Sequence, residues 1–163
     1  MINQLLKGFV DLFYGTGRIK RKYQTENPTE TVLASDASKG IVTTTNQDVQ
    51  RGLDWVTSQR AVVILTDKKI VCGKWTIQLD NVQKAQLIKI SSLFGSGQVL
   101  KIETKDENNY QFGMQLNPEW TNQKVLLLTL ENGQVKNSPF SLMVRLFLVG
   151  YLIFWLYERF FHA

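Results

Sequence analysis

Few side chains of this sequence have the type and spacing that catalysis or metal binding requires. The single histidine, His162, is the second-last residue, and the single cysteine is Cys72. A histidine-based triad, a Cys–His pair or a histidine metal site is therefore not expected. Cys72 falls in an apolar segment, so we expect a small core residue rather than a nucleophile. The sequence predicts a non-enzymatic protein with no catalytic residues, no metal and no cofactor.

Basic side chains form two groups that have the chemistry to contact an anionic surface. The first group follows an apolar segment near the N-terminus and contains Arg18, Lys20, Arg21 and Lys22. The second flanks two adjacent predicted turns and contains Lys68, Lys69 and Lys74. Each Lys or Arg near an anionic membrane surface adds about 1 kcal/mol of attraction. Both groups are candidate lipid-binding residues, and the alternative is that they are simply solvated.

The first basic group is preceded by a predicted amphipathic helix over residues 1–14. Its apolar residues recur at helical spacing, and Gly15-Thr16-Gly17 is expected to end it. We therefore predict an N-terminal helix with a basic arm over residues 1–22 and a polar linker over residues 23–30. The apolar face of this helix suits either a membrane interface or a docking site on the rest of the protein.

The C-terminal segment, residues 138–162, is predicted to be a separate hydrophobic membrane-anchor helix that begins at Ser138-Pro139. From Phe140 to Tyr157 it would measure about 27 Å, close to the roughly 30 Å of a bilayer core. Arg145 interrupts the apolar run and would cost about 2.5–3.5 kcal/mol at mid-bilayer, unless it reaches the interface. The anchor residues that we single out are Phe140, Leu146, Phe147, Leu148, Tyr151, Ile153, Phe154, Trp155 and Tyr157.

Two placements of this segment are open: a single span or interfacial anchor in a membrane, or a helix buried within a protein assembly. On the N-terminal flank of the apolar run, Lys124, Lys136 and Arg145 outnumber the single Arg159 on the other flank. This bias predicts that the central domain faces the cytoplasm. The chain carries a net charge of +5, most of it at the N-terminal end, and the central region is nearly neutral. We therefore expect a membrane lipid partner, with a protein partner or a second copy of the chain, and no nucleic acid.

Between these two ends, residues 31–133 have the pattern of an antiparallel β domain. Arg60–Thr66 is a short apolar run typical of a buried strand. Val99–Lys105 and Tyr110–Leu116 alternate apolar and polar residues on either side of a turn, as in a hairpin with one buried face. Further strands are predicted over residues 70–72, 75–79 and 82–90, with a glycine- and serine-rich loop over residues 91–98. Residues 31–34 and 40–45 are predicted to form either a strand pair or one bulged strand.

A helix is expected after the last strand. Asn117-Pro118-Glu119 supplies an N-cap, a proline at the first helical position and an acid in the first turn. Asn132-Gly133 is a stop signal, so we predict a helix to about Glu131. Its apolar residues Trp120, Leu127 and Leu130 would close one end of the β domain.

These motifs resemble those of the bacterial PH and GRAM-like domains of the pleckstrin-homology-like superfold. Thr66-Asp67-Lys68-Lys69-Ile70-Val71 is similar to that family's turn between two strands, and Trp75–Val82 is similar to its next strand. The resemblance implies an α+β, mainly β fold: a partly open barrel of about seven antiparallel strands capped by one C-terminal helix. It also implies binding of lipids, peptides or other domains, because one fold serves many functions.

The sequence thus favours a non-enzymatic, membrane-anchored PH/GRAM-like module that recognises protein partners or anionic lipid at the cytoplasmic membrane face. The alternative is a small accessory subunit or assembly factor of a membrane protein complex, with the last helix packed among other helices.

Overall fold

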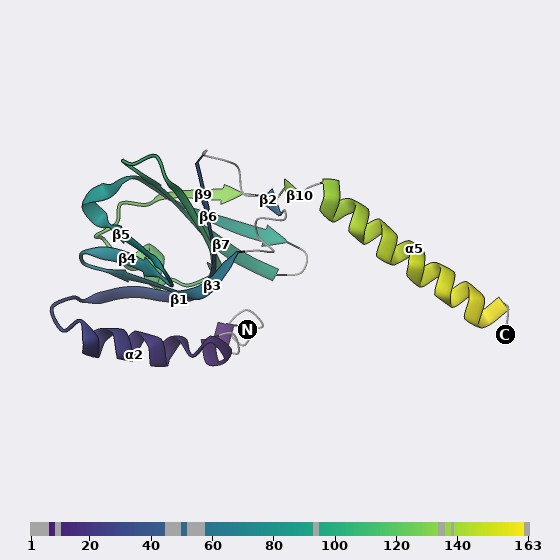
Figure 1. Cartoon of the computed structure of the whole chain (residues 1–163), viewed down its shortest axis with the longest axis horizontal. Coiled ribbons are helices and arrows are strands. Elements are labelled where there is room, and N and C mark those ends of the chain that lie inside the picture. Colours follow the sequence, from purple (N-terminus) through teal and green to yellow (C-terminus); the bar gives the residue numbers. More distant parts are fainter. Residues whose placement is uncertain are drawn as a thin grey trace.

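A computed structural model of the chain describes residues 7–8, 11–44, 50–51, 58–92, 95–133, 136–137 and 139–161. It consists of a curled β domain with a helix beside it and a long C-terminal helix that projects from it (Figure 1). The elements follow one another in this order: α2 Thr16–Glu26, β1 Val32–Thr43, β2 Gln50–Arg51, β3 Gln59–Thr66, β4 Lys69–Cys72, β5 Trp75–Gln78, η1 Leu79–Asn81, β6 Val82–Ser92, β7 Gly95–Thr104, β8 Asn109–Gln115, α4 Glu119–Asn122, β9 Thr129–Gly133, β10 Lys136–Asn137 and α5 Pro139–Phe161.

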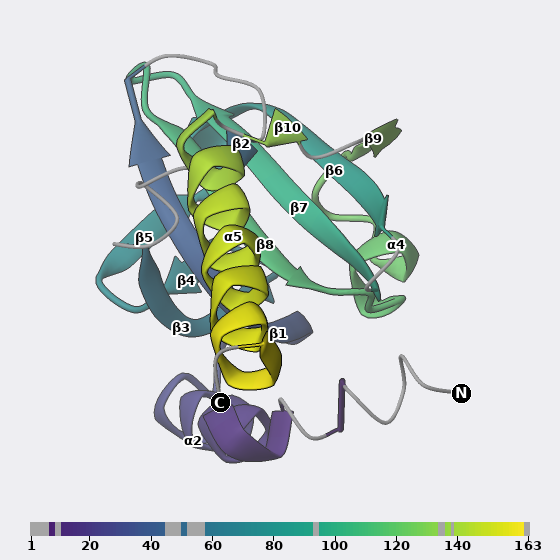
Figure 2. The same cartoon turned by 90° about the vertical axis from the view of Figure 1, so that its right-hand side faces the viewer.

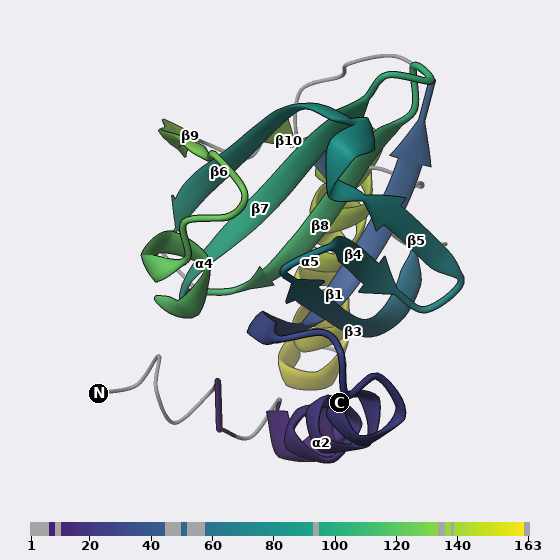
Figure 3. The ribbon, with the colours of Figure 1, turned by 90° about the vertical axis from the view of Figure 1, so that its left-hand side faces the viewer.

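One eight-stranded sheet forms the body of the domain, in the order β5-β4-β3-β1-β8-β7-β6-β9. Neighbouring strands are antiparallel except at the β6–β9 edge, where the pairing is parallel. The sheet curls into a half-barrel (Figures 2 and 3). A separate two-stranded pairing joins β2 and β10 in parallel. The predicted α+β, mainly β class is therefore confirmed.

The core fills the concave side of the sheet. Leu87, Leu100 and Phe112 lie opposite one another on β6, β7 and β8 and are completely buried. Alternation along each strand brings these side chains to one face. Gly40 on β1 makes room for the rings on that face, because a Cβ there would lie 2.5 Å from the Trp75 ring. Burial of this apolar surface is the main stabilising contribution to the domain.

The helix predicted from Pro118 to about Glu131 is wrong beyond Asn122. α4 has four residues, and the backbone turns extended at Gln123. The Gln123 side chain accepts a hydrogen bond from the Leu126 amide at 2.8 Å and donates to the Leu126 carbonyl at 2.9 Å, which stabilises the turn. The chain then enters β9, which covers the otherwise open edge of β6.

The capping residues are therefore partly different from those predicted. Trp120 is completely buried and closes one end of the core, as expected. Leu127 and Leu130 are exposed, because they lie on the extended segment and on the outermost strand, and Leu126 is buried instead. The capped barrel of about seven antiparallel strands becomes an eight-stranded half-barrel with a parallel edge, and a one-turn helix replaces the predicted capping helix.

The predicted end of the first helix at Gly15 is correct, and the predicted basic arm and linker after it are wrong. Gly15 has a φ of 62°, a left-handed conformation that interrupts the helical residues 11–14. The chain then resumes as α2, so residues 18–26 are helical rather than a basic arm followed by a linker. Residues 1–6, 9 and 10 of the predicted first helix lie outside the described residues.

The structure resolves one strand alternative and corrects one loop prediction. β1 is one continuous strand of 12 residues with a register shift between Val32 and Ala34, so the bulged strand, and not the strand pair, is correct. The predicted loop at residues 91–98 is mostly the end of β6 and the start of β7, which pair as far as Ser92 and Gly95. Cross-strand hydrogen bonds outweigh the weak strand propensity of glycine and serine here.

Candidate functional site

The most unusual surface of the molecule is that of α5. It begins at Pro139, as predicted from the cap-and-proline signal, and extends for 23 residues, about 35 Å. Its large apolar side chains from Leu146 to Tyr157 are all at least 40% exposed. Residues that follow one another in a helix point in all directions around its axis. No side of this stretch is therefore covered by the rest of the described chain.

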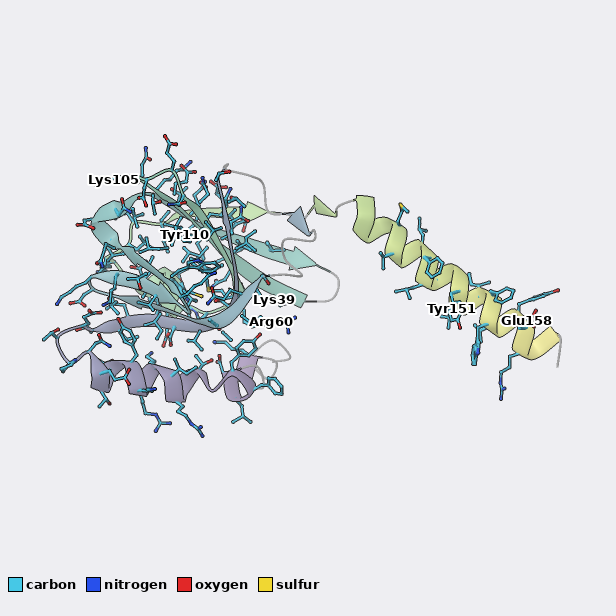
Figure 4. All side chains as sticks on the ribbon, viewed as in Figure 1. Lys39, Arg60, Lys105, Tyr110, Tyr151 and Glu158 are labelled. Atoms are coloured by element: carbon cyan, nitrogen blue, oxygen red, sulfur yellow. The ribbon has the colours of Figure 1, made fainter. Side chains whose placement is uncertain are left out.

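Most of the predicted anchor residues lie on this exposed helix. Leu146, Phe147, Leu148, Tyr151, Ile153, Phe154, Trp155 and Tyr157 belong to it, and the side chains of Phe140 and Arg145 lie outside the described residues. Figure 4 shows Tyr151 and Glu158 on α5, well away from the β domain. Over the described part of the chain, no helix combines the length and apolar character needed to cross a membrane.

The four predicted lipid-binding residues near the N-terminus lie on α2, and two of them have ion-pair partners. Lys20 Nζ lies 3.1 Å from Glu119 Oε1, and Lys22 Nζ lies 3.7 Å from Glu26 Oε1. Arg21 donates to the backbone carbonyl of Gly17, and Arg18 is exposed. Figure 3 shows α2 beneath β1 and β3. The helix is thus docked on the protein, and three of its four basic residues bond within the chain.

Glu119 is central to this docking. One of its carboxylate oxygens accepts from Lys20 of α2 at 3.1 Å, and the other accepts from the backbone N–H of Ser35 on β1 at 3.0 Å. The residue itself begins α4. A single carboxylate therefore connects two helices and a strand.

The second predicted basic group does not form one patch. Lys68 and Lys69 lie at one end of the four-residue strand β4, and Lys74 lies beyond its other end. Lys69 forms a 2.9 Å ion pair with Glu30 and is mostly covered. This hydrogen bond holds the pKa of Glu30 below its ordinary value. Lys74 stands 6.0 Å from the centre of the Trp75 ring. Lys68 is the member of the group that stays exposed without such a contact among the described residues.

The sequence analysis missed a buried acid in β1. Asp36 is completely buried, and one carboxylate oxygen accepts a hydrogen bond from Lys7 Nζ at 3.1 Å. Burial raises the pKa of the Asp36 carboxyl to about 6, although the Lys7 ammonium acts in the opposite direction. The contact between Lys7 and Asp36 holds the segment before α2 on the domain, and Lys7 also pairs with Asp11 at 2.9 Å within that segment. A lone acid among the small residues of Val32–Thr43 was the available signal.

Catalytic chemistry gains no support from the described residues. Cys72 is completely buried, and its Sγ lies 3.4 Å from the Ser38 hydroxyl. Burial raises the pKa of the Cys72 thiol, which disfavours the reactive thiolate. Among the residues that the structure describes, no group of three or more histidine, cysteine, aspartate or glutamate side chains is arranged to hold a metal ion.

Comparisons with known proteins give little further information. No protein-family model matches the chain, and no curated protein matches its sequence. Among solved structures, it is similar to the crystal structure of the C-terminal domain of an unknown protein from Leishmania infantum. The TM-score is 0.38 at 13% sequence identity, over 64% of this chain and 88% of that chain. This similarity assigns no function, so the proposal below depends on the structure alone.

Proposed function

We propose that this chain is a non-enzymatic binding module whose β domain is attached to a membrane through α5. The observation that carries the proposal is the uncovered apolar surface of α5 between Leu146 and Tyr157. Full burial of one large apolar side chain is worth about 1.5–3 kcal/mol. Several such side chains on one helix therefore give a strong driving force to leave water.

A lipid environment suits α5 better than a single protein partner. One partner helix covers one stripe of its neighbour, whereas the exposed apolar residues of α5 surround the helix. Lipid molecules are small and mobile, so they adapt to more of that surface than one rigid partner does. Tyr151, Trp155 and Tyr157 are of the residue types enriched at the membrane–water interface, since their rings are apolar and their polar atoms still find partners.

In this proposal the β domain is the binding part, in the manner of a PH/GRAM-like module at the cytoplasmic face. It is held at the bilayer by a helix that begins only six residues after the end of β9. Of the four basic residues of α2, Lys20 pairs with Glu119 of another element, whereas Arg18, Arg21 and Lys22 are exposed and remain able to contact an anionic surface. A role as an accessory subunit of a membrane complex is an alternative outcome of the experiment.

Vesicle flotation of the full chain tests the proposal. Leu148 and Leu152 lie one turn apart on α5 and are both more than half exposed. Replacement of both by glutamate removes about 3–6 kcal/mol of burial, so partition onto phosphatidylcholine vesicles should fall at least about 100-fold. These side chains make no contribution to the core, so the fold should persist.

The matched control carries the same two added charges on the β domain. Thr76→Glu with Gln83→Glu places them at exposed strand positions, and this variant should float like the wild type. Wild-type protein that stays in solution with vesicles would refute the membrane attachment. Co-purification of a stoichiometric protein on α5, with no flotation, would favour the accessory-subunit role.

A further inference from the structure

A pocket lies at the tip of the β6–β7 hairpin, separate from every basic group discussed so far. Its volume is about 460 Å³, and its walls come from β6, β7, β9 and the residue after β8. The described residues that line it are Lys89, Ile90, Ser91, Ser96, Leu116, Asn132 and Gly133. A lysine, two hydroxyls and an amide therefore converge on one opening, and the lining residues include no carboxylate.

The pocket arises because the inner face of the hairpin changes from apolar to polar near its tip. Leu87 and Leu100 pair within the core, and the next inward pair toward the tip is Lys89 with Gln98. The pair after that is Ser91 with Ser96. Directly paired residues of antiparallel strands point to the same face, and so do alternate residues of one strand. Lys89, Ser91 and Ser96 thus extend the core face into the pocket wall, and Gln98 lies beside Lys89 without lining the pocket.

Gln98, next to this polar wall, is a buried amide with an unpaired donor. It is 2% exposed, and its Nε2 donor makes no hydrogen bond. A buried amide without a partner costs about as much as a lost hydrogen bond, so natural proteins rarely leave one unsatisfied. Its cross-strand neighbour Lys89 is exposed and forms no ion pair within the described part of the chain. An acceptor-rich group in the pocket would serve the Lys89 ammonium.

The position of the pocket relates it to α5. Figure 1 shows that β6 and β9 point toward β10 and the start of α5. Gly133 lines the pocket, and α5 begins at Pro139, six residues later. An extended chain of that length spans at most about 20 Å. A bilayer that receives α5 would therefore present its headgroups near the pocket opening.

We propose that this pocket binds a phosphate monoester through Lys89, Ser91, Ser96 and Asn132. A phosphate monoester carries negative charge and several acceptor oxygens, and it matches one ammonium with a set of neutral donors. The phosphate belongs either to a lipid headgroup or to a soluble ester. The lipid version rests on the proposed membrane attachment, whereas the pocket itself does not.

Calorimetry measures the binding of glycerol 3-phosphate to the full chain and so tests the pocket without a membrane. Lys89→Met keeps the aliphatic stem and removes the charge, so the affinity should fall about 10-fold or more. Ser96→Ala should weaken binding less. The control, Lys105→Met, removes one exposed charge from the β7–β8 turn, at the end of β7 away from the pocket, and should leave the affinity within about 2-fold of the wild type, because screening weakens its effect. No binding by the wild type, or equal losses for Lys89→Met and Lys105→Met, would overturn the pocket.

Flotation separates the two sources of phosphate. If a lipid supplies it, phosphatidic acid in phosphatidylcholine vesicles should strengthen flotation of the wild type but not of Lys89→Met. If phosphatidic acid has no such effect while glycerol 3-phosphate binds, the pocket stands and its ligand is a soluble ester. If glycerol 3-phosphate binds and no vesicle floats the protein, the membrane attachment fails and the pocket survives.

Discussion

Replacement of Asp36 by asparagine should remove a pH dependence from the stability of this fold. The buried Asp36 carboxyl has a pKa of about 6, above its ordinary value of 3.8. The native state therefore holds this proton more tightly than the unfolded chain does. It follows that the free energy of unfolding decreases as the pH rises from the ordinary value to the native one, and the loss is complete above about 6.

The size of this effect follows from the two values. Each unit of difference between the native and unfolded pKa values changes the free energy of unfolding by about 1.4 kcal/mol, when a pH well below both values is compared with a pH well above both. Between about pH 4.5 and pH 7.5 the carboxyl should cost about 2 kcal/mol of stability. The charged groups that face it are Lys7 and Asp11 on the preceding helical segment, and Asn117 faces it from the segment after β8. None of these groups is altered in Asp36→Asn.

Urea unfolding, monitored by the tryptophan fluorescence to which the buried Trp120 contributes, measures the effect. The difference in unfolding free energy between wild type and Asp36→Asn should change by about 2 kcal/mol between about pH 4.5 and pH 7.5, in favour of the wild type at the lower pH. Asp106→Asn is the control. Hydrogen bonding, chiefly from Asn81, holds the pKa of Asp106 below its ordinary value, so its stabilisation is lost only at more acidic pH. If the difference in unfolding free energy between the wild type and Asp36→Asn does not vary with pH, the reasoning is refuted.

Two further predictions concern packing of the β domain, and urea unfolding measures both. Gly40→Ala should destabilise the fold by about 1–3 kcal/mol, because its Cβ would lie 2.5 Å from the Trp75 ring, whereas Gly17→Ala meets no atom within 4 Å and should leave stability nearly unchanged. Trp120→Ala should lower the free energy of unfolding by about 3–5 kcal/mol, because this side chain is completely buried. The control, Leu127→Ala, changes an 87% exposed position and should lower it by less than about 0.5 kcal/mol. Equal losses of stability in the two variants would contradict the placement of α4.

Local sequence patterns predicted most of the sheet. The apolar run that forms β3 and the alternation in β7 and β8 are local signals, so they can be recognised without knowledge of the fold. The region after α4 failed for the opposite reason. Thr129–Gly133 pairs with β6, which lies about forty residues earlier in the chain. Nothing in the sequence of the segment itself reveals that partner.

The candidate site was predictable in part. Composition alone pointed to the terminal helix, because a continuous apolar run needs no tertiary information. Lys20 pairs with Glu119 and Lys69 pairs with Glu30, and both ion pairs join segments that are distant in the sequence. The sequence alone therefore could not show that these two lysines have partners. The pocket around Lys89 was hidden for the same reason, since its walls come from three strands and a connecting residue.

The surroundings of one α5 side chain test the central claim most directly. Ile153→Cys can carry an environment-sensitive fluorophore, because the native Cys72 is completely buried and protected from labelling. With phosphatidylcholine vesicles, emission from this label should shift to the blue and be quenched by a lipid-borne quencher, while the same label at Thr76→Cys should not respond. A label at residue 153 that stays fully accessible to an aqueous quencher in the presence of vesicles would contradict membrane attachment through α5.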